Sequence, residues 1–254
     1  MEERGRALRV CALYPDLMNI YADRGNMLVL ERRCAWRGID FQLTPSGLGE
    51  TLDPEAHDLF YLGGGQDRDQ RLCAEDLIET KSAGLHAAAA RDAVVLGVCG
   101  GYQLLGHSYT LGREEIAGVG LLDVETVRED APRLIGNIAI EVSLESHQPA
   151  ASGELLVGFE NHGGRTRLAE GQAPLGRVLK GHGNDGRSGM EGARSANTIG
   201  TYLHGPLLPK NTWFADWLIA RALGMEPGEL APLDDGLERA AHAGAGRAAG
   251  VPVG

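Results

Sequence analysis

The feature that most constrains the fold of this chain is an apolar run followed at once by a cysteine and two glycines. Residues 93–98 read AVVLGV, and residues 99–106 read CGGYQLLG. Because the run is rich in β-branched residues and nearly free of polar ones, it predicts a central strand covered on both faces. The glycines around Cys99 permit a tight turn from this strand into a helix, which is the layout of a nucleophile elbow.

Short apolar runs alternate with amphipathic segments through the first half of the chain. Strands are predicted at 9–14, 58–65 and 93–98, and helices at 26–37 and 69–91. This alternation predicts an α/β fold of three layers, with a mostly parallel central sheet and helices on both faces. Further apolar segments, which need not all form parallel strands, lie at 119–127, 134–142, 155–161 and 198–204, and a last helix is predicted at 211–223.

The domain organisation is read from composition. Residues 1–225 are predicted to form one domain without an internal repeat. Residues 226–254 end in AAHAGAGRAAGVPVG, in which glycine and alanine dominate. Such side chains bury too little apolar surface to offset the entropy of ordering, so we expect a flexible tail.

Overall composition excludes some classes of partner. The 254 residues are 43% hydrophobic and 23% charged, as in soluble globular proteins, and carry a formal net charge of −11. That balance argues against nucleic acid, which is bound through clustered Lys and Arg. There is neither an apolar run of about 18 residues nor a secretory signal, so we expect no membrane insertion and a cytoplasmic location.

Cys99 differs from the other three cysteines. Cys11, Cys34 and Cys73 lie in apolar segments, and the four thiols fit neither a disulfide framework nor a zinc spacing. We expect those three to be small buried hydrophobes. At Cys99 the start of a helix would bring free N–H groups and the positive end of the helix dipole near the sulfur, which favours the thiolate form. Cys99 is therefore the predicted nucleophile.

A thiol nucleophile needs a base that is distant in sequence and adjacent in space. His204 ends an apolar strand and is followed by Gly205 and Pro206. Parallel strands would bring it to the sheet edge that carries Cys99, so it is the predicted base. His162 in FENHGGRT also ends a strand before glycines and is the main rival. No pair of histidines stands at ligand spacing with a third ligand nearby, so we expect no metal site.

Two glycine-rich segments remain. YLGGGQD (61–67) would expose consecutive backbone N–H groups after a strand, which suits an oxyanion hole, although a phosphate-binding loop or a plain turn are alternatives. The Lys-Ser/Thr of a P-loop is missing. GHGNDG (181–186) matches G-x-G-x-x-G, but no helix is predicted after it, so we interpret it as a flexible loop.

The motifs together resemble a known family. VLGVCGGYQ followed by TYLHG resembles the class I glutamine amidotransferases, in the branch related to cobyric acid synthase. The resemblance is more specific to the GatD subunits of lipid II isoglutaminyl synthase and runs from about residue 9 to about residue 224. Its longer motifs are YPDLMNIYADRGN (14–26), GGGQDRDQ (63–70), FENHGGRT (159–166) and GTYLHGPLLPKN (200–211).

The resemblance implies a reaction. Cys99 would attack the carboxamide of glutamine, and His204 would take the thiol proton and return it to the leaving ammonia. Backbone N–H groups near Gly65 and Gly100 would hold the oxyanion. Arg133 matches the family's glutamine-binding arginine, whose forked donors suit the α-carboxylate. Gln103 would occupy the position that in related amidotransferases helps to hold glutamine.

The resemblance also implies a partner. A MurT-type, Mur-ligase-like subunit would form a heterodimer with this chain and use ATP and Mg²⁺ to activate D-glutamate of lipid II. Ammonia would convert that residue to D-isoglutamine during peptidoglycan synthesis. This chain itself would need no cofactor.

One departure from the family pattern concerns the base. Class I enzymes usually carry H-x-E, where the glutamate orients the histidine, whereas this chain has His204-Gly205-Pro206. Asp23 and a residue of the partner are the candidates for a third catalytic member. A different thiol hydrolase on the same fold, such as a peptidase or a deglycase, and a non-catalytic binding subunit are the competing interpretations.

Overall fold

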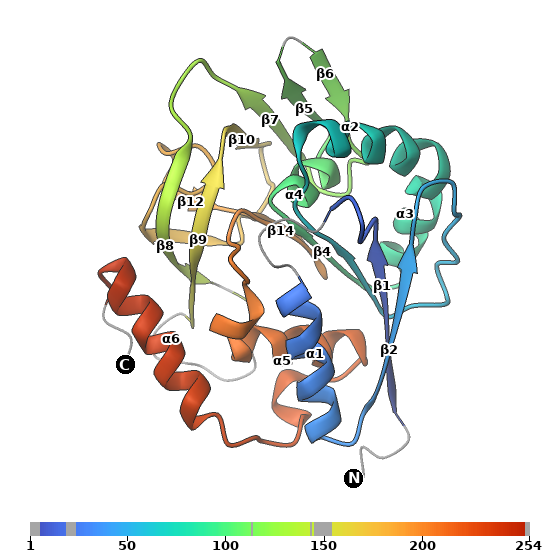
Figure 1. Cartoon of the computed structure of the whole chain (residues 1–254), viewed down its shortest axis with the longest axis vertical. Helices are drawn as coiled ribbons and strands as arrows, with labels where there is room; N and C mark the ends of the chain where they lie inside the picture. The colour runs from blue at the N-terminus through green and yellow to red at the C-terminus, as the bar shows by residue number, and fades with distance from the viewer. Residues whose placement is uncertain (1–5, 19–23, 113, 143, 145–153, 252–254) are drawn as a thin grey trace.

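A six-stranded sheet forms the centre of the computed structural model, which describes residues 6–18, 24–112, 114–142, 144 and 154–251 (Figure 1). The strand order is β13-β14-β4-β3-β1-β2, and every neighbouring pair is parallel except β13 with β14. The strands are β1 (Ala7–Leu13), β2 (Asp40–Ser46), β3 (Leu59–Leu62), β4 (Val94–Val98), β13 (Ala193–Ser195) and β14 (Thr198–Thr201). The predicted α/β class is confirmed.

Helices cover both faces of this sheet. One face carries α1 (Arg24–Trp36) and α5 (Thr212–Ala222), which pack against each other. The other carries α2 (Asp67–Asp76), a π-helical turn (Leu77–Lys81), α3 (Ser82–Ala90) and α4 (Gly100–Leu105). The single helix predicted at 69–91 is therefore divided in three.

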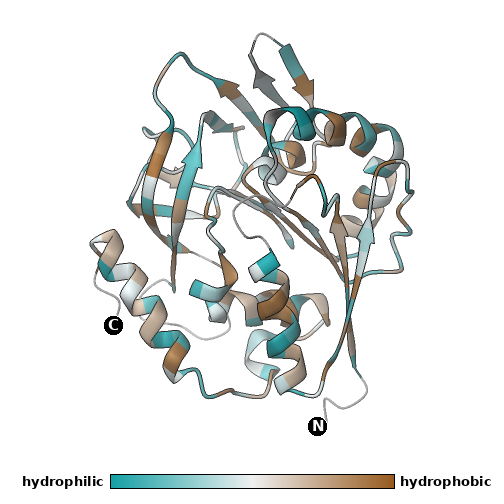
Figure 2. Ribbon diagram, in the orientation of Figure 1, coloured by the Kyte–Doolittle hydropathy of each residue, from teal (hydrophilic) through white to brown (hydrophobic). Residues whose placement is uncertain are grey.

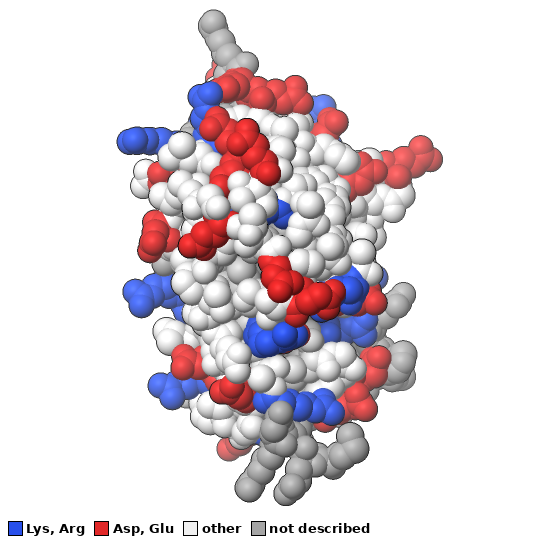
Figure 3. Space-filling model, turned by 90° about the vertical axis from the view of Figure 1, so that its right-hand side faces the viewer, with Lys and Arg blue, Asp and Glu red and all other residues white. Residues whose placement is uncertain are grey.

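Alternation along the strands produces two hydrophobic cores. Val94, Leu96 and Val98 of β4 belong to the core under α1 and α5, whereas Val95 belongs to the core under α2 and α3. Successive side chains of a strand point to opposite faces, so a continuous apolar run serves both layers. Figure 2 shows this as brown strands through the middle of the molecule. On the face shown in Figure 3, acidic and basic side chains are interspersed.

Two smaller sheets follow in the second half of the chain. Their orders are β10-β7-β5-β6 and β12-β11-β8-β9, and all their pairs are antiparallel except β5 with β7. The first comprises β5 (Ser108–Leu111), β6 (Glu114–Ala117), β7 (Val124–Arg128) and β10 (Gly164–Leu168). The second comprises β8 (Leu134–Val142), β9 (Glu154–His162), β11 (Gly176–Lys180) and β12 (Met190–Glu191).

The C-terminal segment corrects one prediction. Composition predicts a flexible tail over 226–254, whereas Gly236–Ala249 form the helix α6, which lies against β8 and β9 (Figure 1). Ala249 packs with Ala139 and Val157 in a small apolar cluster. Alanine permits this close approach, so the feature that argued for disorder is what lets the helix dock. No helix in the described ranges has the length and apolarity that crossing a membrane requires.

A buried ion network ties α1 to the C-terminal half. Arg33 is 1% exposed and donates hydrogen bonds to the carboxylates of Asp216 (2.5 and 2.6 Å) and Asp235 (2.8 and 2.9 Å). Arg37 donates two more to Asp216, at 2.9 and 2.7 Å. Because Asp216 lies in α5 and Asp235 directly precedes α6, two guanidinium groups hold three elements together.

We predict that Asp216→Ala lowers the free energy of unfolding by about 3–5 kcal/mol, because it leaves two buried arginines with one carboxylate fewer. Glu114→Ala, which breaks a pair with Arg71 whose two side chains are about half exposed, is the control and should cost less than about 1 kcal/mol. Urea unfolding followed by circular dichroism measures both values. Equal losses in the two variants would contradict the prediction.

Candidate active site

Cys99 stands in the strained turn that the sequence predicts. Its backbone has φ 55° and ψ −108°, a conformation that non-glycine residues rarely adopt, and its N–H donates a 2.8 Å hydrogen bond to the carbonyl oxygen of Thr201. A Cβ on Gly101 would overlap the carbonyl oxygen of Leu62, so only glycine lets α4 approach the sheet this closely. The residue is partly exposed, whereas Cys11, Cys34 and Cys73 are fully buried as expected.

A cavity of about 60 Å³ collects five of the predicted site residues: Gly65, Cys99, Gly100, Gln103 and Arg133. They come from the loop after β3, the elbow, α4 and the connection before β8. The remaining lining residues, which the two small sheets and α2 supply, are Gln70, Tyr109, Thr110, Arg128, Asn161, His162, Gly163 and Gly164.

The glycine loop after β3 lies beside the nucleophile. The point where a Cβ on Gly64 would stand is 3.4 Å from Cβ and 3.9 Å from Sγ of Cys99. The amide nitrogen of Gly65 lies 3.2 Å from the corresponding point on Gly100. The two backbone groups predicted as oxyanion donors are therefore neighbours.

His204 reaches the same sheet edge as Cys99 but does not line the cavity. In the parallel pairing of β14 with β4, Thr201 stands opposite Val98, so both chains leave the sheet at its carboxyl end. His204 is 2% exposed and exchanges two backbone hydrogen bonds, of 3.0 and 3.1 Å, with Phe159 of β9. The central sheet and β9 together hold this histidine.

The surroundings of His204 favour its neutral form. Burial, with contributions from His162 and Lys210, lowers the pKa of His204 to about 4, while the carboxylate of Glu160 acts in the opposite direction. The imidazole is therefore uncharged at pH 7 and able to accept a proton.

His162, the rival base, lines the cavity beside Cys99. Its ring stacks on that of Tyr202, with centroids 3.6 Å apart and planes at 2°. Nδ1 lies 2.9 Å from the carbonyl oxygen of Gly164, and Nε2 lies 3.9 Å from the carboxylate of Glu160. The imidazole forms part of the cavity wall, with Nδ1 bound to the next strand and Nε2 buried without a hydrogen-bond partner among the described residues.

A chain of hydrogen bonds behind the cavity, which motif reasoning missed, orients Gln103. Gln70 donates to its Oε1 at 2.7 Å, and its Nε2 donates to the hydroxyl of Tyr202 at 3.2 Å. The Tyr202 hydroxyl lies 2.6 Å from that of Thr166, which lies 2.7 Å from that of Thr126. Gln70, Thr166 and Tyr202 lie within the motifs quoted from the sequence and Thr126 does not, but only the fold shows that the four side chains form one line.

Two fully buried glutamates accept hydrogen bonds from segments near the site. Glu160 accepts backbone hydrogen bonds from His182 (2.7 Å) and Gly183 (2.9 Å). The GHGNDG segment is therefore held on a buried carboxylate rather than being a flexible loop. Glu191 accepts from the hydroxyl of Thr201 and the N–H of Tyr202, both at 2.7 Å, and burial raises its pKa to about 7.

Asp23, the candidate third catalytic member, lies outside the described residues.

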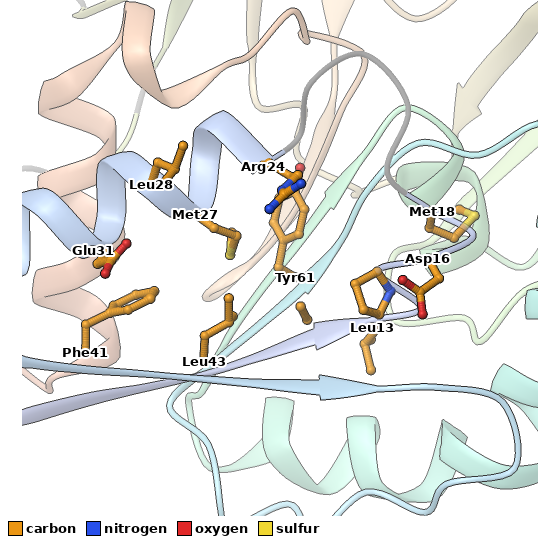
Figure 4. Close-up of a pocket in the computed structure, with 12 residues that line it drawn as sticks. Leu13, Asp16, Met18, Arg24, Met27, Leu28, Glu31, Phe41, Leu43 and Tyr61 are labelled. Carbon is orange, nitrogen blue, oxygen red and sulfur yellow. The ribbon is translucent and has the colours of Figure 1, made fainter.

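A separate groove of about 510 Å³ is lined by Met27 and Leu28 of α1 and by Phe41 and Leu43 of β2, with Met18 at one end (Figure 4). A Cβ on Gly65 would overlap the sulfur of Met18, so this methionine separates the groove from the glycine loop of the site.

Comparison with known proteins identifies the family. Residues 9–212 match the model of the CobB/CobQ-like glutamine amidotransferase domain. Lipid II isoglutaminyl synthase (glutamine-hydrolyzing) subunit GatD of Streptococcus pneumoniae is 36% identical over 87% of this chain and 83% of its own length. The corresponding subunit of Staphylococcus aureus is 38% identical over 85% and 86%.

Among solved structures, PurLQS from Thermotoga maritima shares the fold, with a TM-score of 0.57 and 21% identity over 87% of this chain and 93% of that one. The chain therefore belongs to the CobB/CobQ-like glutamine amidotransferase family and, within it, to the family of GatD subunits.

We predict that the imidazole of His204 titrates well below pH 6.5, the usual midpoint for histidine, because burial disfavours its charged form. The unfolded chain would take up this proton near pH 6.5, so acidification from there towards pH 4 should favour unfolding. Two-dimensional ¹H–¹⁵N NMR of the imidazole nitrogens measures the midpoint. His162→Gln should raise it, since it removes one of the neighbours that lower this pKa. A midpoint near 6.5 in the wild type would contradict the prediction.

Proposed function

We propose that this chain is the glutaminase subunit of a lipid II isoglutaminyl synthase. It hydrolyses L-glutamine to glutamate and ammonia in the cytoplasm, and a MurT-type ligase subunit uses the ammonia to amidate D-glutamate of lipid II. The observation that carries the proposal is Cys99 on a strained elbow, in one cavity with the backbone of Gly65 and Gly100 and the guanidinium of Arg133. The names of the two GatD relatives, as glutamine-hydrolysing subunits, support it.

The chemistry follows from these groups. The sulfur of Cys99 attacks the γ-carboxamide carbon of glutamine while His204 takes the thiol proton. The N–H groups of Gly65 and Gly100 donate to the oxyanion of the tetrahedral intermediate. His204 then gives its proton to the leaving ammonia, and a γ-glutamyl thioester remains on Cys99. Water, deprotonated by His204, cleaves the thioester, and glutamate leaves as the thiol is restored.

Arg133 and Gln103 would hold the substrate for this reaction. Arg133 donates from Nε and Nη2 to the side chain and the backbone carbonyl of Asn161, at 2.8 and 2.7 Å, so the guanidinium is held in place at the cavity. Gln103 is fixed in the same way by Gln70 and Tyr202. Groups whose position is set before binding lose little entropy when the substrate arrives.

The remaining assignments concern the partner. The ligase subunit would supply the ATP and Mg²⁺ chemistry, and this chain would use no cofactor. The orienting group for His204 would be Asp23 or a residue of the partner, since no glutamate follows at H-x-E.

Cys99→Ala should abolish glutamine hydrolysis, with a loss of at least about a thousandfold, because the covalent intermediate cannot form. The measurement is glutamate release from L-glutamine by the purified chain, alone and with its ligase partner. Cys73→Ala, at a fully buried thiol away from the cavity, is the matched control and should retain turnover. An unchanged rate in Cys99→Ala would overturn the proposal. No release by the wild type in either condition would favour a non-catalytic binding subunit.

A second pair of variants tests the base. His204→Ala should remove nearly all turnover, because it removes the imidazole that we assign as the acceptor of the thiol proton, whereas His162→Ala should reduce it less. Initial rates at saturating glutamine decide the order, and a larger loss at His162 would reassign the base.

Asp23→Asn should lower kcat sharply with the fold intact if Asp23 orients His204, and a normal rate would assign that task to the partner.

A further inference from the structure

We propose that Arg128 is a second specificity-determining arginine, and that Arg128 and Arg133 hold the α-carboxylate of the substrate between them in the space above Gly163. This inference rests on the proposed glutaminase function and extends it. It names a residue and a subsite through which the site would distinguish free glutamine from glutamine whose α-carboxylate is blocked.

The geometry defines the subsite. Arg128 ends β7, Arg133 directly precedes β8, and both line the cavity that contains Cys99. The point where a Cβ on Gly163 would stand is 3.6 Å from Nη1 of Arg133. The same point is 3.7 Å from Cζ and 3.9 Å from Nε of Arg128, and these are the three nearest heavy atoms. Two guanidinium groups from different positions in the chain therefore border one small space.

The chemistry of that space favours a carboxylate. Arg133 uses Nε and Nη2 on Asn161, which leaves Nη1 as the donor nearest the space above Gly163. A planar carboxylate has two oxygens and can accept from two guanidinium groups at once. In a chain of net charge −11, two guanidinium groups beside one small space form a local positive region, which suits the α-carboxylate of zwitterionic glutamine.

The connection that carries both arginines is held in place. Arg165, which is 4% exposed, donates to the carbonyl oxygen of Gly163 at 3.0 Å and to that of Pro132 at 2.7 Å. Glu129, next to Arg128, accepts two hydrogen bonds from Arg187, at 3.1 and 2.8 Å. The floor of the subsite and the residues beside both arginines are thus ordered before substrate binds, as a specificity site requires.

The predicted consequence is that the site distinguishes substrates by whether their α-carboxylate is free. Free L-glutamine presents an α-carboxylate to the arginines and its carboxamide to Cys99. L-Glutaminamide, in which the α-carboxylate is an uncharged amide, lacks the group that the arginines recognise. A guanidinium that faces an uncharged group loses its charge-assisted hydrogen bonds, so the difference between the two substrates should depend on Arg128.

The test compares these two substrates on the complex of the chain with its ligase partner. Arg128→Ala should raise KM for L-glutamine about 10- to 100-fold with little change in kcat, because a charge-assisted interaction is lost in binding. On L-glutaminamide, wild type and Arg128→Ala should have similar kcat/KM for release of the γ-ammonia. Arg177→Ala, an exposed arginine on β11 paired with Glu141, is the charge control and should change neither value.

Two glycine-to-alanine variants, one at the subsite and one away from it, test whether the space above Gly163 holds the α-carboxylate. The φ of Gly163 is not left-handed and its nearest neighbours stand at ordinary contact distances, so Gly163→Ala should fold normally while its methyl group fills the subsite. We expect KM for L-glutamine to rise at least about tenfold, as for Arg128→Ala. Gly136→Ala is the matched control, because Gly136 also has an ordinary φ and has nothing within 4 Å of its added methyl.

The outcomes separate this inference from the proposed function. An unchanged KM in Arg128→Ala, or an equal loss on both substrates, would overturn the inference while glutaminase activity of the wild type stands. If the wild-type complex releases no glutamate, the proposed function fails. Calorimetric binding of L-glutamine to the Cys99→Ala complex then decides the inference: a Kd raised by Arg128→Ala supports it, and an unchanged Kd or no binding at all overturns it.

Discussion

The site depends on one backbone hydrogen bond, from the N–H of Cys99 to the carbonyl oxygen of Thr201. It is the last link between two neighbouring parallel strands, and beyond it both chains turn away from the sheet. One continues into the elbow and α4, and the other continues towards His204. The register of β4 with β14 therefore determines which residues meet at the edge, and the rest of the cavity is assembled around that junction.

Several groups at this edge of the sheet lower the stability of the folded chain. A strained cysteine, an imidazole kept neutral by burial and two fully buried glutamates all lie near the junction. Unfavourable groups of this kind persist where the surroundings over-determine them. Here the compensation is visible as hydrogen bonds: Glu160 binds two backbone N–H groups of a glycine-rich loop, and Glu191 binds Thr201 and Tyr202. These hydrogen bonds offset part of the free-energy cost of burying the two carboxylates.

Sequence reasoning predicts the parts that depend on local patterns. The apolar run before Cys99 specifies a buried parallel strand because both of its faces must be covered. The glycines after it specify the turn because no other residue permits the close approach of α4. The α/β class and the burial of the other three thiols follow from the same reasoning, and the structure confirms both.

What sequence could not supply are features that depend on distant partners. Gln70 and Thr166 lie in two separate motifs, and nothing in either motif shows that the fold aligns them behind Gln103. Glu160 becomes important only because an unrelated loop turns its N–H groups towards it. The alanines of α6 suggest disorder in isolation, yet they dock on β8 and β9 because a sheet face of matching shape is present. Local composition does not encode such complementarity.

The close packing of α4 on the central sheet has a broader consequence. At Gly97 and Gly101 there is no room for a side chain, since a Cβ would meet Leu105 at 2.6 Å in one case and the backbone of Leu62 in the other. The nucleophile is therefore aimed by contact between main chains, which have no rotamers through which to relax. The position of the sulfur therefore depends on the absence of side chains at Gly97 and Gly101. A single added methyl group at either position, two residues from Cys99, would shift the helix, the elbow and the oxyanion donors together.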